Sequence, residues 1–118
     1  MLQKKYANTY GVWLTDIGNA VCPSGETVKE LYDRVVMAVS NIAKENDGKT
    51  IVIVTHATPI RALCCCARGF AAENMKNVPW VSNASLAVVQ AEKGQLSLLE
   101  EDVCRYLSNL QTYFPANV

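Results

Sequence analysis

The sequence lacks three features that would assign it to a large class of proteins. Eleven Lys and Arg residues balance eleven Asp and Glu residues, so the basic surface typical of nucleic-acid-binding proteins is not expected. No apolar run approaches the roughly 18 residues that a membrane-spanning helix needs. The start, Met1 to Tyr6, has a basic pair but no apolar signal-peptide segment behind it. These absences predict a cytoplasmic protein that binds neither nucleic acid nor a membrane.

Histidine is scarce, and the cysteines are irregularly spaced. His56 is the only histidine, and the five cysteines include three in a row, Cys64, Cys65 and Cys66, but no Cys-x-x-Cys pair. Protein metal sites usually combine His, Cys and acidic side chains at regular spacing. We therefore expect no metal and no other cofactor, with a zinc site at the cysteines as the less favoured alternative. The thiols are expected to be reduced and mostly buried.

The chain has about the proportion of apolar residues that a single packed domain needs. Its 118 residues are 50% apolar and 19% charged, which predicts a single domain over residues 1–118. The N-terminal residues are the hardest to interpret, because the stretch 10–14 fits either a short helix or a short strand. A chain that opens in this way looks as though its beginning has been cut away.

The strongest pattern predicts a long helix that begins after Thr27. Apolar residues recur at steps of three and four from Val28 to Ala43. Thr27 and Glu30 match a capping box, and Glu30 and Arg34 are spaced as an i,i+4 ion pair. Gly48 is expected to follow the end of this helix in a left-handed conformation.

The segment Thr50–Thr55 contains four consecutive β-branched apolar residues without polar alternation. Strands of this kind are covered on both faces, as in the interior of a parallel sheet. A second helix is expected next, with Thr58 as its N-cap, Pro59 at its first position and Gly69 at its end. Helix, buried strand and helix in succession predict an α/β fold that binds ligands at the carboxyl ends of parallel strands.

The remaining residues predict a loop, a hairpin and a short helix. Residues 71–83 fit a loop, and the two apolar stretches 86–90 and 96–99 flank Glu92-Lys93-Gly94, a turn sequence typical of a β-hairpin. Apolar spacing over Val103–Leu110 predicts a last helix, and Pro115 marks its end.

Three residues near the predicted helix starts are candidates for chemistry. His56 precedes a helix N-terminus, which attracts anions; alternatively it is a half-buried histidine with both ring nitrogens bonded. Arg61, in the first helical turn, either pairs with a carboxylate or phosphate or extends into solvent. Glu26 is either a general acid, which needs the neutral form, or an acid that complements the helix dipole, which favours the charged form.

In its order of segments, the chain resembles the C-terminal half of the histidine phosphatase superfamily, which includes cofactor-dependent phosphoglycerate mutases and alpha-ribazole phosphatases. The family pattern is a P-x-G-E-S/T turn that opens a helix, then an apolar strand that ends in S-H-G, then another helix. Thr55 and Ala57 replace the usual Ser and Gly, and Ala57 adds a Cβ where the backbone approaches a phosphate. The resemblance covers residues 10–107, and the matching segments are Pro23–Thr27, Arg34, Ile51–Ala57, Ile60–Leu63 and Asn83–Ser85.

The resemblance implies a partial three-layer α/β/α sandwich with a mostly parallel sheet that lacks the family's N-terminal strand. In the family, the histidine of an R-H-G segment on that strand attacks the phosphoryl group and forms a phosphohistidine, while a carboxylate protonates the leaving oxygen. Carried over to this chain, Glu26 is the acid and His56 is the second, charge-stabilising histidine. His56, Ala57 and Arg61 bind phosphate, and the substrate is a small phosphorylated metabolite.

The R-H-G segment is absent from this sequence, because its one histidine matches the second one of the family. We therefore expect the chain by itself to be inactive as a phosphatase or mutase. The rival hypotheses are a non-catalytic phosphate-binding domain and a protein-interaction module. Without the N-terminal strand, Ile51–Val54 would form an unpaired edge, which predicts a homo-oligomer, strand exchange or a rearrangement that covers it.

Overall fold

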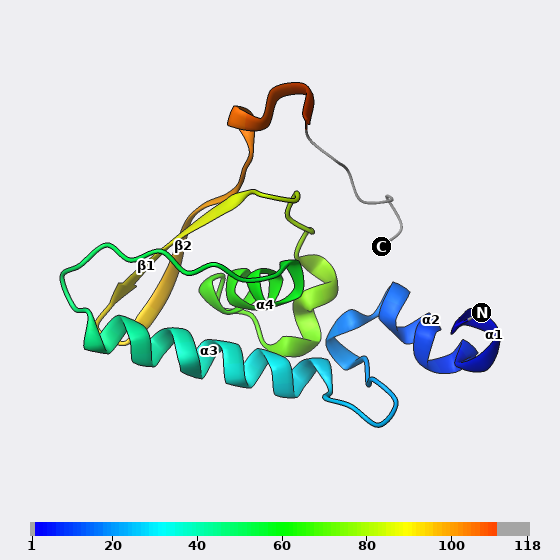
Figure 1. Cartoon of the computed structure of the whole chain (residues 1–118). Helices are drawn as coiled ribbons and strands as arrows, with labels where there is room; N and C mark the ends of the chain where they lie inside the picture. Colours follow the sequence, from blue (N-terminus) through cyan, green and yellow to red (C-terminus); the bar gives the residue numbers. More distant parts are fainter. Residues whose placement is uncertain (1, 111–118) are drawn as a thin grey trace.

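A computed structural model of the chain describes residues 2–110, in which helices pack beside one small sheet (Figure 1). Only one sheet is present in this range, an antiparallel hairpin of two strands. The elements in chain order are α1 (Leu2–Lys5), α2 (Ala7–Thr15), the short 3₁₀ helix η1 (Ile17–Asn19), α3 (Val28–Glu45), α4 (Ala57–Ala67), the 3₁₀ helix η2 (Ala72–Asn77), β1 (Leu86–Glu92), β2 (Gln95–Val103) and the 3₁₀ segment η3 (Arg105–Leu110).

Helix α3 confirms the strongest sequence prediction. The Thr27 hydroxyl accepts a hydrogen bond from the Glu30 N–H at 3.0 Å, and the Thr27 N–H donates to the Glu30 carboxylate at 2.8 Å. The predicted pair of Glu30 with Arg34 is wrong, because Glu30 is occupied by this capping box and Arg34 bonds Glu26 instead. Past the helix, Gly48 has the expected positive φ, +72°.

The segment Thr50–Thr55 does not form the predicted internal strand. In the part of the chain that the structure describes, no hydrogen bond reaches its backbone. Val52 is 84% exposed and Val54 is 93% exposed. A strand forms only where a neighbour satisfies its N–H and C=O groups, and within residues 2–110 no neighbour bonds this segment. The expected mostly parallel, three-layer sandwich is therefore wrong for the observed structure. Residues 2–110 still form a mixed α/β structure, but their sheet is an antiparallel hairpin of two strands.

Helix α4 begins two residues earlier than predicted. His56, not Thr58, is its N-cap, so Pro59 occupies the third helical position. At the other end, the Gly69 N–H donates to the Cys66 carbonyl at 2.8 Å and the Phe70 N–H donates to the Cys65 carbonyl at 3.0 Å. This is a Schellman motif, and Gly69 adopts its left-handed position with a φ of +78°.

The hairpin is confirmed and is longer than predicted. Lys93 and Gly94 connect its strands, both with positive φ, as a type I′ turn requires. Val103 ends β2 instead of opening a helix, and the predicted last helix is reduced to η3; Pro115 lies outside the described residues. At the other end of the chain, the ambiguous stretch 10–14 is helical, and part of the predicted loop 71–83 is η2.

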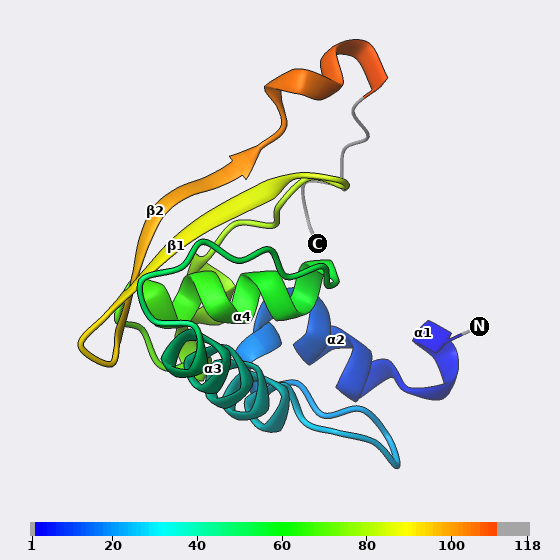
Figure 2. The same cartoon turned by 60° about the vertical axis from the view of Figure 1, so that its left-hand side comes forward.

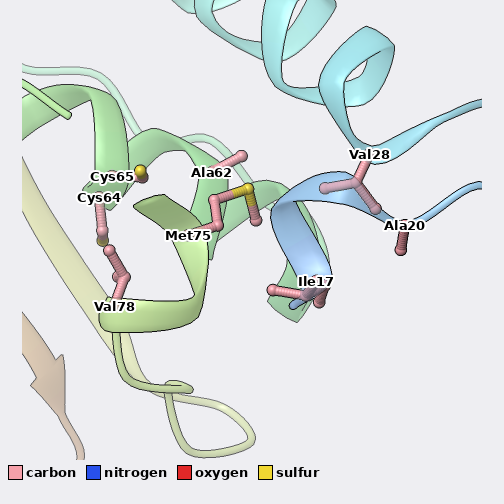
Figure 3. Packing of buried hydrophobic residues seen from close by; sticks show 8 residues of the cluster. All are labelled: Ile17, Ala20, Val28, Ala62, Cys64, Cys65, Met75 and Val78. Atoms are coloured by element: carbon pink, nitrogen blue, oxygen red, sulfur yellow. The ribbon is translucent and has the colours of Figure 1, made fainter. Parts of the chain in front are cut away.

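The core lies where η1, the start of α3, α4 and η2 meet (Figure 3). Met75 and Val78 pack against the buried face of α4, where Cys64 and Cys65 are fully buried. The expectation of buried thiols holds for these two only, because Cys66 and Cys104 are half-buried and Cys22 is exposed. Gly18 permits the close approach of η1 and η2, because a Cβ there would clash with the Ala72 carbonyl oxygen. The core residues are Ile17, Ala20, Val28, Ala62, Cys64, Cys65, Met75 and Val78.

Thr27→Ala is expected to destabilise the fold by about 1 kcal/mol, because it removes the hydroxyl that caps α3. Urea unfolding followed by circular dichroism measures the change. Ser97→Ala, at an exposed position of β2, is the matched control and should change the free energy of unfolding by less than about 0.5 kcal/mol. Equal stability of Thr27→Ala and the wild type would contradict the capping-box assignment.

Candidate functional site

His56 lies at the junction between the exposed segment and α4. Its backbone is extended, with φ −113° and ψ 167°, and its carbonyl accepts the first helical hydrogen bond, from the Ile60 N–H at 3.1 Å. Its side chain is exposed and does not cap the helix. The imidazole is therefore not the half-buried, fully bonded ring of the alternative interpretation.

The first turn of α4 leaves two backbone donors available beside His56. The first N–H groups of a helix have no acceptor within the helix, and here the N-cap side chain supplies none. Ala57 and Thr58 carry these N–H groups, while Pro59 has none to offer. The start of α4 thus presents two backbone amides, an exposed imidazole and the positive end of the helix dipole. This arrangement suits an anion.

Arg61 is buried, so the prediction that its side chain extends into solvent is wrong. Because α4 begins early, Arg61 stands fifth in the helix, and it is 6% exposed. Its Nε donates to the Val78 carbonyl at 2.7 Å, and its guanidinium carbon lies 4.4 Å from the ring centroid of Trp80. No carboxylate of residues 2–110 forms an ion pair with it, and burial lowers the pKa of its guanidinium. These contacts hold α4 against the 78–80 segment; phosphate binding by Arg61 stays a prediction.

Glu26 lies in the turn before α3 and forms a two-pronged ion pair with Arg34. Arg34 Nε donates to Glu26 Oε1 at 2.6 Å, and Nη2 donates to Oε2 at 3.0 Å. This hydrogen bonding holds the pKa of the Glu26 carboxyl below its ordinary value, although partial desolvation opposes the shift. Of the two states that the sequence left open, the structure favours the charged one.

Glu26 lies just before the N-cap of α3, and His56 is the N-cap of α4. Helices α3 and α4 pack against each other, and both begin at the end nearer to α2 (Figure 2). Within the described residues, no hydrogen bond or ion pair joins the two side chains. The structure thus brings His56 together with the Ala57 amide but leaves Glu26 paired with Arg34.

Trp80 is the residue that sequence reasoning missed. It follows η2 in a segment predicted only as a loop, and its ring packs against the Arg61 guanidinium. The available signal was a tryptophan between Val78 and Val81 in a segment predicted as a loop, because so large an apolar side chain usually finds a packing partner.

No helix between residues 2 and 110 is long and apolar enough to cross a membrane. The same residues contain no group of three His, Cys, Asp or Glu side chains that could hold a metal ion.

The ion pair predicts how Glu26 titrates. In Arg34→Met, the Glu26 pKa should rise toward its ordinary value, as measured by carboxyl-detected NMR titration. Because the folded-state pKa is lowered, the pair stabilises the fold above the ordinary carboxyl range, and this contribution disappears as the pH falls through the folded-state pKa. Lys29→Met, which removes a cation paired with Asp33, is the control and should leave the Glu26 titration unchanged. An identical Glu26 titration in the wild type and Arg34→Met would contradict the assignment.

Known proteins share both the sequence pattern and the fold. A sequence model of the histidine phosphatase superfamily (branch 1) matches residues 1–102. Phosphoserine phosphatase 1 of Hydrogenobacter thermophilus is 24% identical over 106 residues, which cover 90% of this chain and 50% of that protein. The structure of Bacillus stearothermophilus YhfR matches with a TM-score of 0.79 at 16% identity, over 87% of this chain and 51% of YhfR. The chain spans about half the length of these two relatives, and its family match shows that it belongs to the histidine phosphatase superfamily.

Proposed function

We propose that this chain is the phosphate-binding portion of a phosphoglycerate mutase-like histidine phosphatase. Its substrate is a small phosphorylated metabolite, and the reaction of the complete site is phosphomonoester hydrolysis or phosphoryl transfer through a phosphohistidine. The observation that carries the proposal is the exposed imidazole of His56 at the N-terminus of α4, in a chain that belongs to this family.

The proposed site binds the phosphoryl group through His56 and the start of α4. The Ala57 and Thr58 N–H groups donate to phosphoryl oxygens, and a protonated His56 adds a charge-assisted hydrogen bond. Such donors stabilise the negative charge of the phosphoryl group during transfer. The Ala57 Cβ leaves a phosphoryl group less room to approach the backbone than the glycine of the family pattern does.

Glu26 and Arg61 contribute in less direct ways. Glu26 is the proposed acid, but Arg34 keeps its carboxylate charged, and a general acid must carry a proton before it can give one to the leaving oxygen. The acid role therefore requires that Arg34 release Glu26 when substrate binds. Arg61 is buried and acts on the site by fixing α4, which makes it a positioning residue in this proposal.

The chain by itself is proposed to bind phosphate without turning over phosphomonoesters. Its one histidine occupies the binding position, and the sequence has no R-H-G segment to supply a nucleophile. The chain then corresponds to a fragment of the family's domain. The name of the Hydrogenobacter relative makes phosphoserine a reasonable test substrate.

Binding of inorganic phosphate tests the site. Titration calorimetry should detect binding to the wild type and a roughly tenfold loss of affinity in His56→Ala, equivalent to about 1.4 kcal/mol. Lys44→Ala, which removes an exposed cation from the last turn of α3, is the control and should bind as the wild type does. Equal affinity of the wild type and His56→Ala would refute the site.

Turnover separates the catalytic fragment from a non-catalytic binding domain. With p-nitrophenyl phosphate or phosphoserine, the chain alone should release phosphate no faster than buffer, since a missing nucleophile removes the covalent step. Activity that appears when an R-H-G-bearing fragment of a relative is added would support a catalytic fragment, and its continued absence would support a binding domain. Substantial turnover by the chain alone, lost in His56→Ala, would overturn the inactivity proposal.

A further inference from the structure

The contact between Arg61 and Trp80 ties α4 to the segment 78–80. The Arg61 guanidinium carbon lies 4.4 Å from the ring centroid of Trp80, a distance at which a cation is attracted to the face of an indole ring. Arg61 Nε also donates to the Val78 carbonyl at 2.7 Å. One side chain of α4 is therefore held at both ends of this segment.

Both partners of Arg61 are anchored by the core. The Val78 side chain is 1% exposed and lies beside Cys64 (Figure 3), and the Val78 N–H donates to the Met75 carbonyl at 3.0 Å. Trp80 is half-buried and packs against the same core. The guanidinium is thus fixed by a carbonyl oxygen and a ring that are themselves fixed.

Neither partner cancels the charge of Arg61. An arginine stays protonated at neutral pH, and this one is 6% exposed. Among residues 2–110, no carboxylate forms an ion pair with it. A backbone carbonyl and an indole ring carry no net charge, so a full positive charge remains in surroundings where water screens it weakly.

This charge lies close to the start of α4. Arg61 follows Ala57 by four positions, which corresponds to about 6 Å along the axis of a helix. Helical side chains also lean toward the N-terminus of their helix. The separation is shorter than the Debye length of about 10 Å at 0.1 M salt. The charge therefore adds to the positive end of the helix dipole, where the proposed site binds a phosphoryl group.

We propose that Trp80 is a positioning residue of the phosphate site, because its ring holds the Arg61 guanidinium as a cation without a counter-charge behind the first turn of α4. This inference rests on the proposed function. A carboxylate in place of the ring would also fix Arg61, but it would cancel the charge. An aromatic face fixes the guanidinium and leaves its charge available to phosphate.

Titration calorimetry with inorganic phosphate tests whether the aromatic face matters. Trp80→Leu should bind phosphate roughly fivefold more weakly, whereas Trp80→Phe, which keeps an aromatic face, should stay within about twofold of the wild type. Trp13→Leu is the matched control, because Trp13 packs against the core and no cation of residues 2–110 lies over its ring. It should bind as the wild type does. Equal affinity of Trp80→Leu and Trp80→Phe would overturn the proposal.

A double-mutant cycle shows whether Trp80 acts through Arg61. Arg61→Met, which removes the charge and keeps a long apolar side chain, should weaken phosphate binding. Adding Trp80→Leu to Arg61→Met should then cause no further loss, because the ring has no cation left to hold. Urea unfolding identifies the conditions in which every variant is folded, and affinities are compared there. Additive losses from the two substitutions would overturn the proposal.

NMR of the wild type provides a test that does not depend on whether the variants fold. Phosphate should shift the Arg61 Nε–Hε signal and the Trp80 indole signal saturably, with the dissociation constant that calorimetry gives. Two signals that stay unchanged in phosphate-saturated protein would overturn the proposal.

Failure of this inference can be told apart from failure of the proposed function. A wild type that does not bind phosphate would overturn both. Phosphate binding that His56→Ala weakens and Trp80→Leu leaves unchanged would overturn the role of Trp80 alone.

Discussion

The buried face of α4 is the interaction on which the rest of this structure depends. Cys64 and Cys65 pack against Met75 and Val78, which are 0% and 1% exposed, and burying a side chain of the latter kind contributes about 1.5–3 kcal/mol. Arg61 adds its hydrogen bond to the 78–80 segment on the same side. Because α4 is fixed along its length, its first turn has a defined position, and so do His56 and the Ala57 amide.

The segment Thr50–Thr55 shows what happens where such packing is missing. It leads directly into α4, yet its valines are open to solvent and its backbone has no hydrogen-bond partner among residues 2–110. Packing against the core is enough to keep a helix in place, because the backbone hydrogen bonds of a helix lie within the helix itself. A strand cannot be held in this way, because its hydrogen bonds need a neighbouring strand.

Local signals in the sequence were sufficient for the long helix α3, the end of α4 and the hairpin, but not for the start of α4 or the last helix. The capping box at Thr27, the Gly69 helix end and the Lys93-Gly94 turn are each decided by a few neighbouring residues, and all three are observed. The prediction for Thr50–Thr55 failed because a buried strand depends on distant partners, which its own sequence cannot guarantee.

For the candidate site, sequence placed His56 at a helix start but could not give the environments of the charged residues. Burial of Arg61 depends on Trp80, 19 positions away in the chain. The charged state of Glu26 depends on Arg34 bonding Glu26 instead of Glu30, which pairs with Thr27. Such choices are made by three-dimensional packing. The family resemblance added the chemistry of phosphate, which neither composition nor spacing could have supplied.

Residue-resolved NMR with added inorganic phosphate tests the central claim most directly, namely that the anchored start of α4 is an anion site. We expect saturable chemical-shift changes that are largest at the Ala57 and Thr58 amides and at the His56 ring. Shifts that are spread over the surface lysines, or that are centred on residues away from α4, would contradict it.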